Sequence, residues 1–536
     1  MSKLKAQSSK LLEFPVAGIR IAFAFALFLV PAGTMRAGEG AGAGARPNLV
    51  IILADDLGYG DTGCYGSKLV PTPSIDSLAR DGVRCTDGYV TASVCAPSRC
   101  GLLSGSYNQR FGMQWNDDRG KYQFGAHKLL PQALRAAGYV AGHIGKWNVP
   151  ADPKDCFDEV HELIDWEADY FPDASGHYVG VDSETEHASS KRQGIWGPER
   201  PSDEYLTDRI GRRAVEFVEK RKTRDKPFFL YLAFNAVHSP YHAKKDVQAR
   251  FASLTPPLNY YAAMIASLDE NIGKVLAVLP ENTLVAFTAD NGPAKMPVKV
   301  WPEGWPTDVI AGSAGPLSGH KAQFLEGGIR EPFILRWPGH LDAGKVYRQV
   351  VSTMDLYPTF LAAAGAPLPE STKLDGVNLL PYLRGEKSGA LHDVLFWKKD
   401  DSGAAREGDW KLLINSWEPK LQLFNLANDI GETRDLAGEK ADVLKRLHER
   451  WLGWSAPLPP RANPPAVKAG QGKPAQDRGA IFEMKDKNHD GKLSLEEFLA
   501  NQPDLEAAKV RFEKWDIDKD AALSRKEFIG MGQSHR

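Results

Sequence analysis

The chain has almost no net charge and few cysteines for its length of 536 residues. Lysine and arginine contribute 66 side chains against 68 from aspartate and glutamate, so the formal net charge is −2 at pH 7. A nucleic-acid-binding protein needs a basic surplus to meet the phosphates, so this balance argues against nucleic acid as a partner. The hydrophobic fraction of 43% and the charged fraction of 25% are typical of a globular protein. At this length we expect two or three folded units.

The chain also lacks an apolar run of the length that a membrane span requires. The N-terminal run Ile21–Val30 is too short, follows several basic residues and precedes a stretch of small residues, Ala32–Ala45. This order of basic, apolar and small residues is typical of a secretory signal peptide. We therefore expect residues 1–45 to be a signal peptide and spacer, and the protein to be periplasmic or secreted. A retained N-terminal anchor is the alternative.

Cysteine is scarce, and its count is odd. The five are Cys64, Cys85, Cys95, Cys100 and Cys156. An exported chain meets an oxidising environment in which thiols can pair, and an odd count leaves at least one without a partner in the chain. We expect Cys95 to be the unpaired residue, because it belongs to the most specific motif of the chain. The other four can form two bridges in three ways or remain reduced.

Buried strands alternate with amphipathic helices over the first two thirds of the chain. A continuous apolar run at 47–54 is typical of a strand covered on both faces of a parallel sheet. Similar runs and the helical patterns between them predict an α/β fold with a mostly parallel sheet sandwiched by helices. The other runs are Tyr139–Ile144, Pro227–Phe234 and Thr283–Thr288, and the helical patterns are Ser74–Asp81, Leu129–Ala137, Asp203–Lys222 and Asn259–Leu279.

The pattern changes after residue 390. Three short strands followed by a helix predict a smaller α+β subdomain with an antiparallel sheet. The strands are Val394–Lys398, Trp410–Ile414 and Leu421–Asn425, and the helix is Gly438–Trp451. A Pro- and Ala-rich stretch then predicts a linker. The expected domains are 46–390 for the main α/β domain, 391–454 for the subdomain, 455–479 for the linker and 480–536 for a last unit.

Polar side chains follow each of the four predicted strands of the main domain. In open α/β sheets, functional residues collect at the carboxyl ends of the strands. Oxygen donors without paired His or Cys ligands suit calcium or magnesium and not zinc. The residues are Asp55 and Asp56 after the first strand, Lys146 after the second, His238 after the third, and Asp290 and Asn291 after the fourth.

The most specific motif is Cys95-Ala-Pro97-Ser-Arg99. A cysteine near proline is ordinarily a buried small residue or half of a disulfide. Here the motif matches the signature of the type I, formylglycine-dependent sulfatases of the alkaline phosphatase superfamily, and the chain resembles that family from about 46 to 454. The matching segments include Asp55–Asp61, Gly138–Trp147, His238–Pro240, Thr288–Gly292, Lys321–Pro332 and Leu423–Glu432.

The resemblance implies an alkaline-phosphatase-like fold and the hydrolysis of sulfate esters. It implies that a formylglycine-generating enzyme converts Cys95 to 3-oxoalanine (formylglycine), whose hydrate attacks sulfur. The substrate is then a sulfated saccharide, or an aryl sulfate as a surrogate. The resemblance also assigns roles by position. Asp55, Asp56, Asp290 and Asn291 bind calcium, Arg99 holds the hydrate, Lys146 and Lys321 stabilise sulfate, and His238 protonates the leaving alcohol.

One position departs from the family pattern. Asn148 stands where the family usually has a histidine that helps deprotonate the second hydroxyl of the hydrate. An amide cannot accept a proton at neutral pH, so another group or the metal has to take this role, or sulfate release is slow. His143 and His320 are near in sequence.

The last unit contains a twelve-residue acidic pattern twice, at an interval of thirty residues. The spacing is that of the EF-hand calcium loop, so we expect an EF-hand pair that stabilises the protein or docks onto a partner. The sixth position of the second loop is Ala521, where the turn prefers glycine. An acid-rich solvated surface is the alternative. The ligands are Asp486, Asn488, Asp490, Ser494 and Glu497 in the first loop, and Asp516, Asp518, Asp520, Ser524 and Glu527 in the second.

Two other functions remain open from the sequence. One is a phosphomonoester or phosphonate hydrolase of the same superfamily, and the other is a non-catalytic calcium-dependent glycan-binding protein with an unmodified Cys95. Several aromatic residues can stack on sugar rings or can equally be packing residues. They are Trp166, Tyr170, Trp301 and Trp305.

Overall fold

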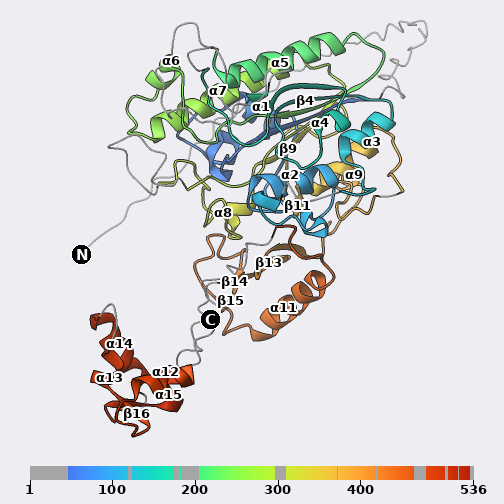
Figure 1. Cartoon of the computed structure of the whole chain (residues 1–536). Coiled ribbons are helices and arrows are strands. Elements are labelled where there is room, and N and C mark those ends of the chain that lie inside the picture. Colours follow the sequence, from blue (N-terminus) through green and yellow to red (C-terminus); the bar gives the residue numbers. More distant parts are fainter. Residues whose placement is uncertain are drawn as a thin grey trace, which may run out of the picture. The chain divides into compact units, whose positions relative to one another are not determined.

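The computed structural model (Figure 1) describes most of the chain after residue 45. The predicted signal peptide, Trp301 and Trp305 lie outside the described residues. Among the described helices, none combines the length and apolar character of a membrane span. The described ranges are 46–118, 124–172, 181–182, 204–295, 309–370, 372–416, 420–463, 478–500, 505–516 and 518–530.

A sheet of nine strands forms the centre of the main domain. Its middle strands, β8, β1, β7, β4 and β5, are parallel, and antiparallel pairs occur on both sides of them. In spatial order the strands are β10 (Lys345–Tyr347), β2 (Val83–Cys85), β9 (Phe333–Arg336), β8 (Thr283–Ala289), β1 (Asn48–Ala54), β7 (Phe228–Ala233), β4 (Val140–Lys146), β5 (Glu159–Ile164) and β6 (Val181–Asp182).

Helices cover both faces of this sheet (Figure 1), which explains the continuous apolar runs of its strands. Alternate residues of β1 point to opposite faces, so Val50 and Ile52 pack in one hydrophobic core while Leu49 and Ile51 pack in the other. The first core is completed by α1 (Pro73–Arg80), α5 (Leu206–Arg221) and α7 (Leu258–Leu276). The second is completed by α2 (Cys95–Ser104), α3 (Leu130–Ala136) and α9 (Leu356–Ala363).

The predicted α/β layering is confirmed. The four predicted apolar runs are β1, β4, β7 and β8, which lie next to one another in the sheet. Short elements were not predicted, because two to five residues carry too little periodicity to identify a strand or helix. These include β2, β9 and β10 of the main sheet, the pair β3 (Gly88–Tyr89) and β11 (Val351–Ser352), and the helices α4 (Pro153–Cys156), α6 (Lys245–Ala249), α8 (Glu326–Ile329) and α10 (Leu380–Leu383).

A four-stranded antiparallel sheet follows the main domain, in the order β12-β13-β14-β15. The helix α11 (Ala441–Ser455) packs Val443, Leu447 and Trp451 against it. The predicted antiparallel sheet is confirmed, although β13 was missed because its sequence, SGAARE, has no bulky apolar residue. The strands are β12 (Leu395–Lys399), β13 (Ser402–Glu407), β14 (Trp410–Asn415) and β15 (Lys420–Asn425).

A buried ion cluster joins this sheet to the main domain. The Lys411 side chain on β14 is inaccessible to solvent and lies between two carboxylates. Its Nζ is 2.9 Å from Glu326 Oε1 on α8 and 2.8 Å from Glu432 Oε1. Glu432 Oε2 also accepts a 2.6 Å hydrogen bond from the Glu326 backbone N–H. The two carboxylates therefore share one lysine across the junction.

The last described segments form two helix–loop–helix units. Their loops pair through the short antiparallel strands β16 (Lys492–Ser494) and β17 (Ala522–Ser524). Phe482, Phe498 and Phe528 pack with other apolar residues into a core of their own. The helices are α12 (Arg478–Lys485), α13 (Leu495–Leu499), α14 (Leu505–Trp515) and α15 (Arg525–Gly530).

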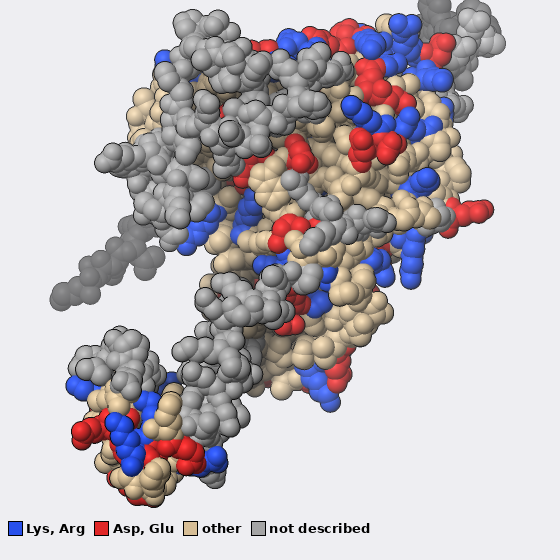
Figure 2. All heavy atoms as spheres, viewed as in Figure 1, with Lys and Arg blue, Asp and Glu red and all other residues tan. Residues whose placement is uncertain are grey.

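All five cysteines lie among the described residues, and none is in a disulfide. Cys64 is half-buried and the others are buried. Figure 2 shows acidic and basic side chains interspersed over the visible face of the molecule, in keeping with the small net charge.

We predict that Lys411→Met destabilises the protein by about 3–5 kcal/mol, because it leaves the buried carboxylate of Glu432 without its cation, whereas Glu326 keeps Arg330. Chemical denaturation followed by circular dichroism measures the change. The control is Lys445→Met, whose side chain is 77% exposed. A loss for Lys411→Met no larger than that of the control contradicts the prediction.

Candidate active site

The register of the parallel strands brings the predicted polar residues together at one edge of the sheet. Ala54 pairs with Ala289 at the ends of β1 and β8, so the residues that follow these strands are neighbours. The Asp290 backbone N–H donates to the Ala54 carbonyl at 3.1 Å. The Asp56 backbone N–H in turn lies 3.3 Å from Asp290 Oδ1.

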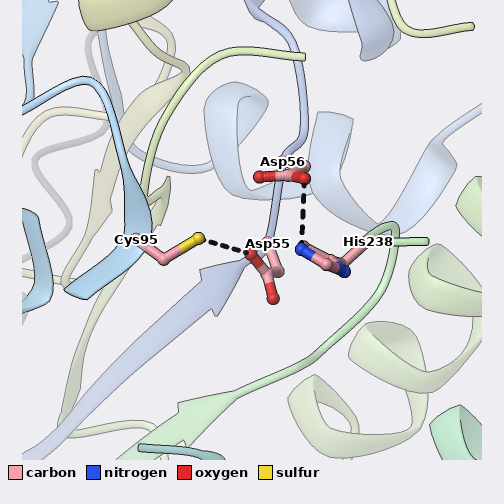
Figure 3. Close-up of side chains that lie close together, drawn as sticks. All are labelled: Asp55, Asp56, Cys95 and His238. Carbon is pink, nitrogen blue, oxygen red and sulfur yellow. Dashed lines mark hydrogen bonds and ion pairs between the residues drawn. The ribbon is translucent and has the colours of Figure 1, made fainter. Parts of the chain in front are cut away.

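Cys95 begins α2 and faces the same edge. Its Sγ lies 3.6 Å from Asp55 Oδ1, as Figure 3 shows. One ligand atom from each of Asp55, Asp56, Cys95 and His238 lies within 4.8 Å of the others, and all four residues are buried. Figure 3 also shows His238 directed toward Asp56, with Nε2 3.6 Å from Oδ2.

Each of the three acids at these strand ends has its own cationic partner. All of these side chains are buried or nearly so. Buried charges are stable only when they are paired, so the pairing balances this cluster. Lys146 Nζ lies 2.5 Å from Asp55 Oδ2, Lys321 Nζ lies 2.6 Å from Asp56 Oδ1, and Arg99 Nη2 lies 2.7 Å from Asp290 Oδ2.

The pairs with Lys146 and Lys321 keep Asp55 and Asp56 ionised. Burial by itself raises the pKa of Asp55 and Asp56, but the neighbouring cations outweigh it and lower both pKa values below the ordinary range. Lys146 has the largest such effect on Asp55, and Lys321 on Asp56. Burial lowers the pKa of Lys321, but Asp56 outweighs it and raises that pKa well above its usual value.

The Cys95 thiol is not an activated nucleophile. Burial raises its pKa to about 12, even though Lys146 and Lys321 act in the opposite direction. The thiolate is the reactive form of cysteine, so the unmodified side chain is almost entirely in its unreactive form at neutral pH. This geometry favours a chemistry in which residue 95 does not react as a thiolate.

His238 is held by its backbone neighbour. Its Nδ1 lies 2.7 Å from the Ser239 carbonyl, which leaves Nε2 facing the acids. Burial lowers the pKa of His238, partly offset by Asp56. Burial therefore favours the neutral form of His238, and its Nε2 can donate a proton as a general acid only from the protonated form.

The donors at the strand ends fit a hard divalent cation. Asn291 Oδ1 is buried and has no hydrogen-bond partner among the described residues, whereas its Nδ2 donates to Asp56 Oδ1 at 2.7 Å and to the Gly292 carbonyl. A buried acceptor without a partner is costly, and a cation ligand removes that cost. Together with three carboxylates it forms the all-oxygen donor set that calcium and magnesium prefer.

Three polar residues near the motifs lie outside this group. Asn148 is buried, and its Nδ2 donates to the Asp165 carbonyl at 2.8 Å. His143 packs against Tyr231 and Trp147, and burial lowers its pKa to about 3. His320 Nδ1 contacts the carbonyl of the adjacent lysine. Neither histidine belongs to the described group around Cys95.

The structure also shows supporting residues that the sequence did not reveal. Asn116 Oδ1 accepts a 3.0 Å hydrogen bond from the Ala96 backbone N–H, next to Cys95. The Tyr170 hydroxyl lies 2.7 Å from the Asn235 carbonyl and 2.8 Å from that of His238. Tyr170 is fully buried, so it holds the His238 loop and is not a platform for a sugar. No local sequence signal marks such contacts, since they join distant segments.

The chain matches two protein-family models. The sulfatase family model matches residues 47–366, and a second model, N-sulphoglucosamine sulphohydrolase, C-terminal, matches residues 320–453. Human N-acetylgalactosamine-6-sulfatase is 32% identical over 424 residues, covering 74% of this chain and 77% of the relative. Human arylsulfatase A is 32% identical over 466 residues, covering 76% and 87%.

Solved structures agree with this result. The crystal structure of Ps i-CgsB in complex with k-i-k-neocarrahexaose has a TM-score of 0.67 and 31% identity, covering 78% of this chain and 94% of that one. Phosphonate monoester hydrolase of Agrobacterium radiobacter has a TM-score of 0.55 and 20% identity, covering 77% and 96%. The second likeness shows only that the fold is shared.

We predict that Tyr170→Phe lowers the free energy of unfolding by about 1–2 kcal/mol, because it removes the hydroxyl that holds two buried carbonyls. Denaturant titration measures the loss. The control is Tyr382→Phe, since among the described residues the Tyr382 hydroxyl has no hydrogen bond. Equal stabilities of the two variants would show that the Tyr170 hydroxyl does not support the His238 loop.

Proposed function

Because the chain belongs to the sulfatase family and is a sulfuric ester hydrolase, we propose that it removes sulfate from carbohydrates by means of a modified residue 95 and a calcium ion. The observation that carries the proposal is the position of Cys95, 3.6 Å from Asp55 within a cluster of buried acids and cations. A buried thiol of raised pKa is a poor nucleophile there. Formylglycine instead supplies a hydrated aldehyde whose hydroxyl group acts as the nucleophile. A formylglycine-generating enzyme is then the partner during maturation.

Calcium is the proposed ion at the strand ends, held by oxygens of Asp55, Asp56, Asp290 and Asn291. Bound there, it supplies Lewis-acid polarisation of a sulfate oxygen. Three carboxylates are already balanced by three cationic side chains, so a divalent ion leaves the site with a positive surplus. A positive, buried site favours the binding of an anionic sulfate group.

The side chains of the site then have separate roles in the reaction. Lys146 and Lys321 point into the acid cluster and stabilise negative charge on the sulfate oxygens. Arg99 donates to Asp290 and to the Lys146 carbonyl, so it fixes the side of the site from which residue 95 projects. His238 offers its Nε2 proton to the departing alcohol, which otherwise leaves as an unstable alkoxide.

Asn148 cannot accept the proton that is released when sulfate departs. Its amide is committed to the Asp165 carbonyl and cannot act as a base. The proton released when sulfate departs therefore passes to another group at this site. His238 is the titratable imidazole already grouped with Cys95 among the described residues.

A carbohydrate substrate is supported by the relatives. One is named for N-acetylgalactosamine 6-sulfate, and a solved neighbour binds a neocarrahexaose. The rival phosphonate hydrolase reading is not favoured, because it rests on a likeness in fold at 20% identity. The aspartate and asparagine oxygens at the strand ends also form one set, and we propose one ion for it.

We predict that Cys95→Ala lowers the kcat/KM for 4-nitrophenyl sulfate by at least about a thousandfold, because the reacting group is lost. Mass spectrometry of the natively expressed protein should find an aldehyde in place of the thiol in the peptide that contains residue 95. The control is Cys64→Ala, a half-buried cysteine outside the described group. Full activity of a protein with an unmodified Cys95 would falsify the proposal.

We also propose that the two C-terminal loops bind calcium as an EF-hand pair in an exported, periplasmic or secreted protein. Asp516, Asp518 and Glu527 bring one oxygen each within 4.8 Å of one another. In both loops the first aspartate accepts hydrogen bonds from backbone N–H groups inside the loop, such as Gly491 N–H at 2.9 Å and Ala521 N–H at 3.0 Å. Ala521 adopts φ 65°, a left-handed conformation that is unfavourable for alanine, so the second loop should bind more weakly.

We predict that the double change Glu497→Gln and Glu527→Gln in the full chain lowers the calcium stoichiometry by about two ions per chain, because position 12 supplies two oxygens in each loop. Isothermal titration calorimetry gives the count. Glu513→Gln, an exposed acid on α14, is the control. An unchanged stoichiometry in the double variant contradicts the EF-hand assignment.

A further inference from the structure

A polar cavity of about 390 Å³ lies between the segment after Lys321 and the antiparallel sheet of the subdomain. Its volume is within the range of small-molecule sites. Amide, hydroxyl and charged side chains line it next to apolar ones, which is the mixture that recognises sugar hydroxyls and rings. The polar lining includes Gln323, Lys399, Asp400, Ser402, Asn415 and Gln422.

Two short links connect this cavity to the active site. On one side, Ala322 lines the cavity and donates its backbone N–H to the Ser93 carbonyl, while the preceding Lys321 contacts Asp56. On the other side, Asn116 holds the N–H next to Cys95, and its neighbour Trp115 contacts Lys399. The segments that line the cavity therefore contact or continue into the segments that carry Lys321 and Cys95.

Lys399 is the cation of this cavity that has no acidic partner. Its Nζ lies 3.5 Å from the centre of the Trp115 ring, and no described carboxylate forms an ion pair with it. Half-buried on an aromatic face, the ammonium has lost part of its hydration, and the neighbouring Asp400 compensates its charge only in part. It is available to an anion that enters the cavity.

Arg461 links the segment that carries Trp115 to the segment that carries Lys399. Its guanidinium contacts Asp117 and Asp118 in the first segment and lies 3.1 Å from Asp400 in the second. Arg461 is buried and compensates these acids. These acids are paired with Arg461, and among the described residues none of them forms an ion pair with Lys399.

We propose that the cavity binds the saccharide part of the substrate and that Lys399 binds a second anionic group on it, a sulfate or a carboxylate. The proposal rests on the function proposed above and specifies the substrate class. The enzyme would then prefer saccharides that carry a negative charge in addition to the sulfate that is removed.

The test compares selectivity, measured as the ratio of kcat/KM for a doubly anionic disaccharide to that for a singly sulfated one. Lys399→Met should lower this ratio about tenfold, because a hydrogen-bonded charge pair is lost. Lys399→Arg should restore most of it. The control is Lys387→Met, an exposed lysine whose Nζ lies 5.9 Å from the Tyr382 ring centre.

Two forms of the doubly anionic disaccharide, one with a second sulfate and one with a carboxylate, identify the anion that Lys399 binds. In the wild-type enzyme the ratio should also fall with rising salt, a result that needs no variant. An unchanged ratio in Lys399→Met, or a wild-type ratio independent of salt, overturns the proposal. If the wild-type enzyme cleaves neither these saccharides nor 4-nitrophenyl sulfate, the proposed function itself fails.

Discussion

Charge compensation among buried side chains governs the arrangement of the whole site. Three carboxylates end two adjacent strands where solvent is excluded, and burial without partners would make them protonated or destabilising. Each is paired with a cation from a different part of the chain. The cations are Arg99 from α2, Lys146 from β4 and Lys321 from the segment before α8. The residues that we propose hold a metal and those that we propose bind sulfate are therefore positioned by the same attractions.

The same principle joins the subdomain to the main domain. Lys411 lies between Glu326 and Glu432, and both acids belong to segments near the polar cavity. Apolar packing around Trp397 supplies the rest of that junction. Buried ionic and apolar contacts therefore support the cavity wall from behind, as the proposed saccharide site requires.

The sequence was sufficient to predict the central strands and the cluster at their ends. Apolar runs of six to eight residues identify β1, β4, β7 and β8, and parallel pairing then brings the residues that follow them to one edge. Contacts from loops could not be predicted in this way. Arg461 and Asp118 are 343 positions apart, and no periodic pattern relates them. Tyr170 and Lys399 also have roles that depend on tertiary neighbours, because their local sequence is compatible with simple packing or exposure.

Arg461 has a consequence for how the chain can be divided. Composition alone places it in a flexible spacer, yet it is a buried residue that lies against Asp118 and Asp400, and Asn463 and Ala462 bond to the same loop. A protease cut or a genetic fusion between α11 and Arg461 would remove a cation from the interior and leave its acids facing one another. A change that replaces the C-terminal loops therefore keeps these contacts only if the new sequence begins after residue 463.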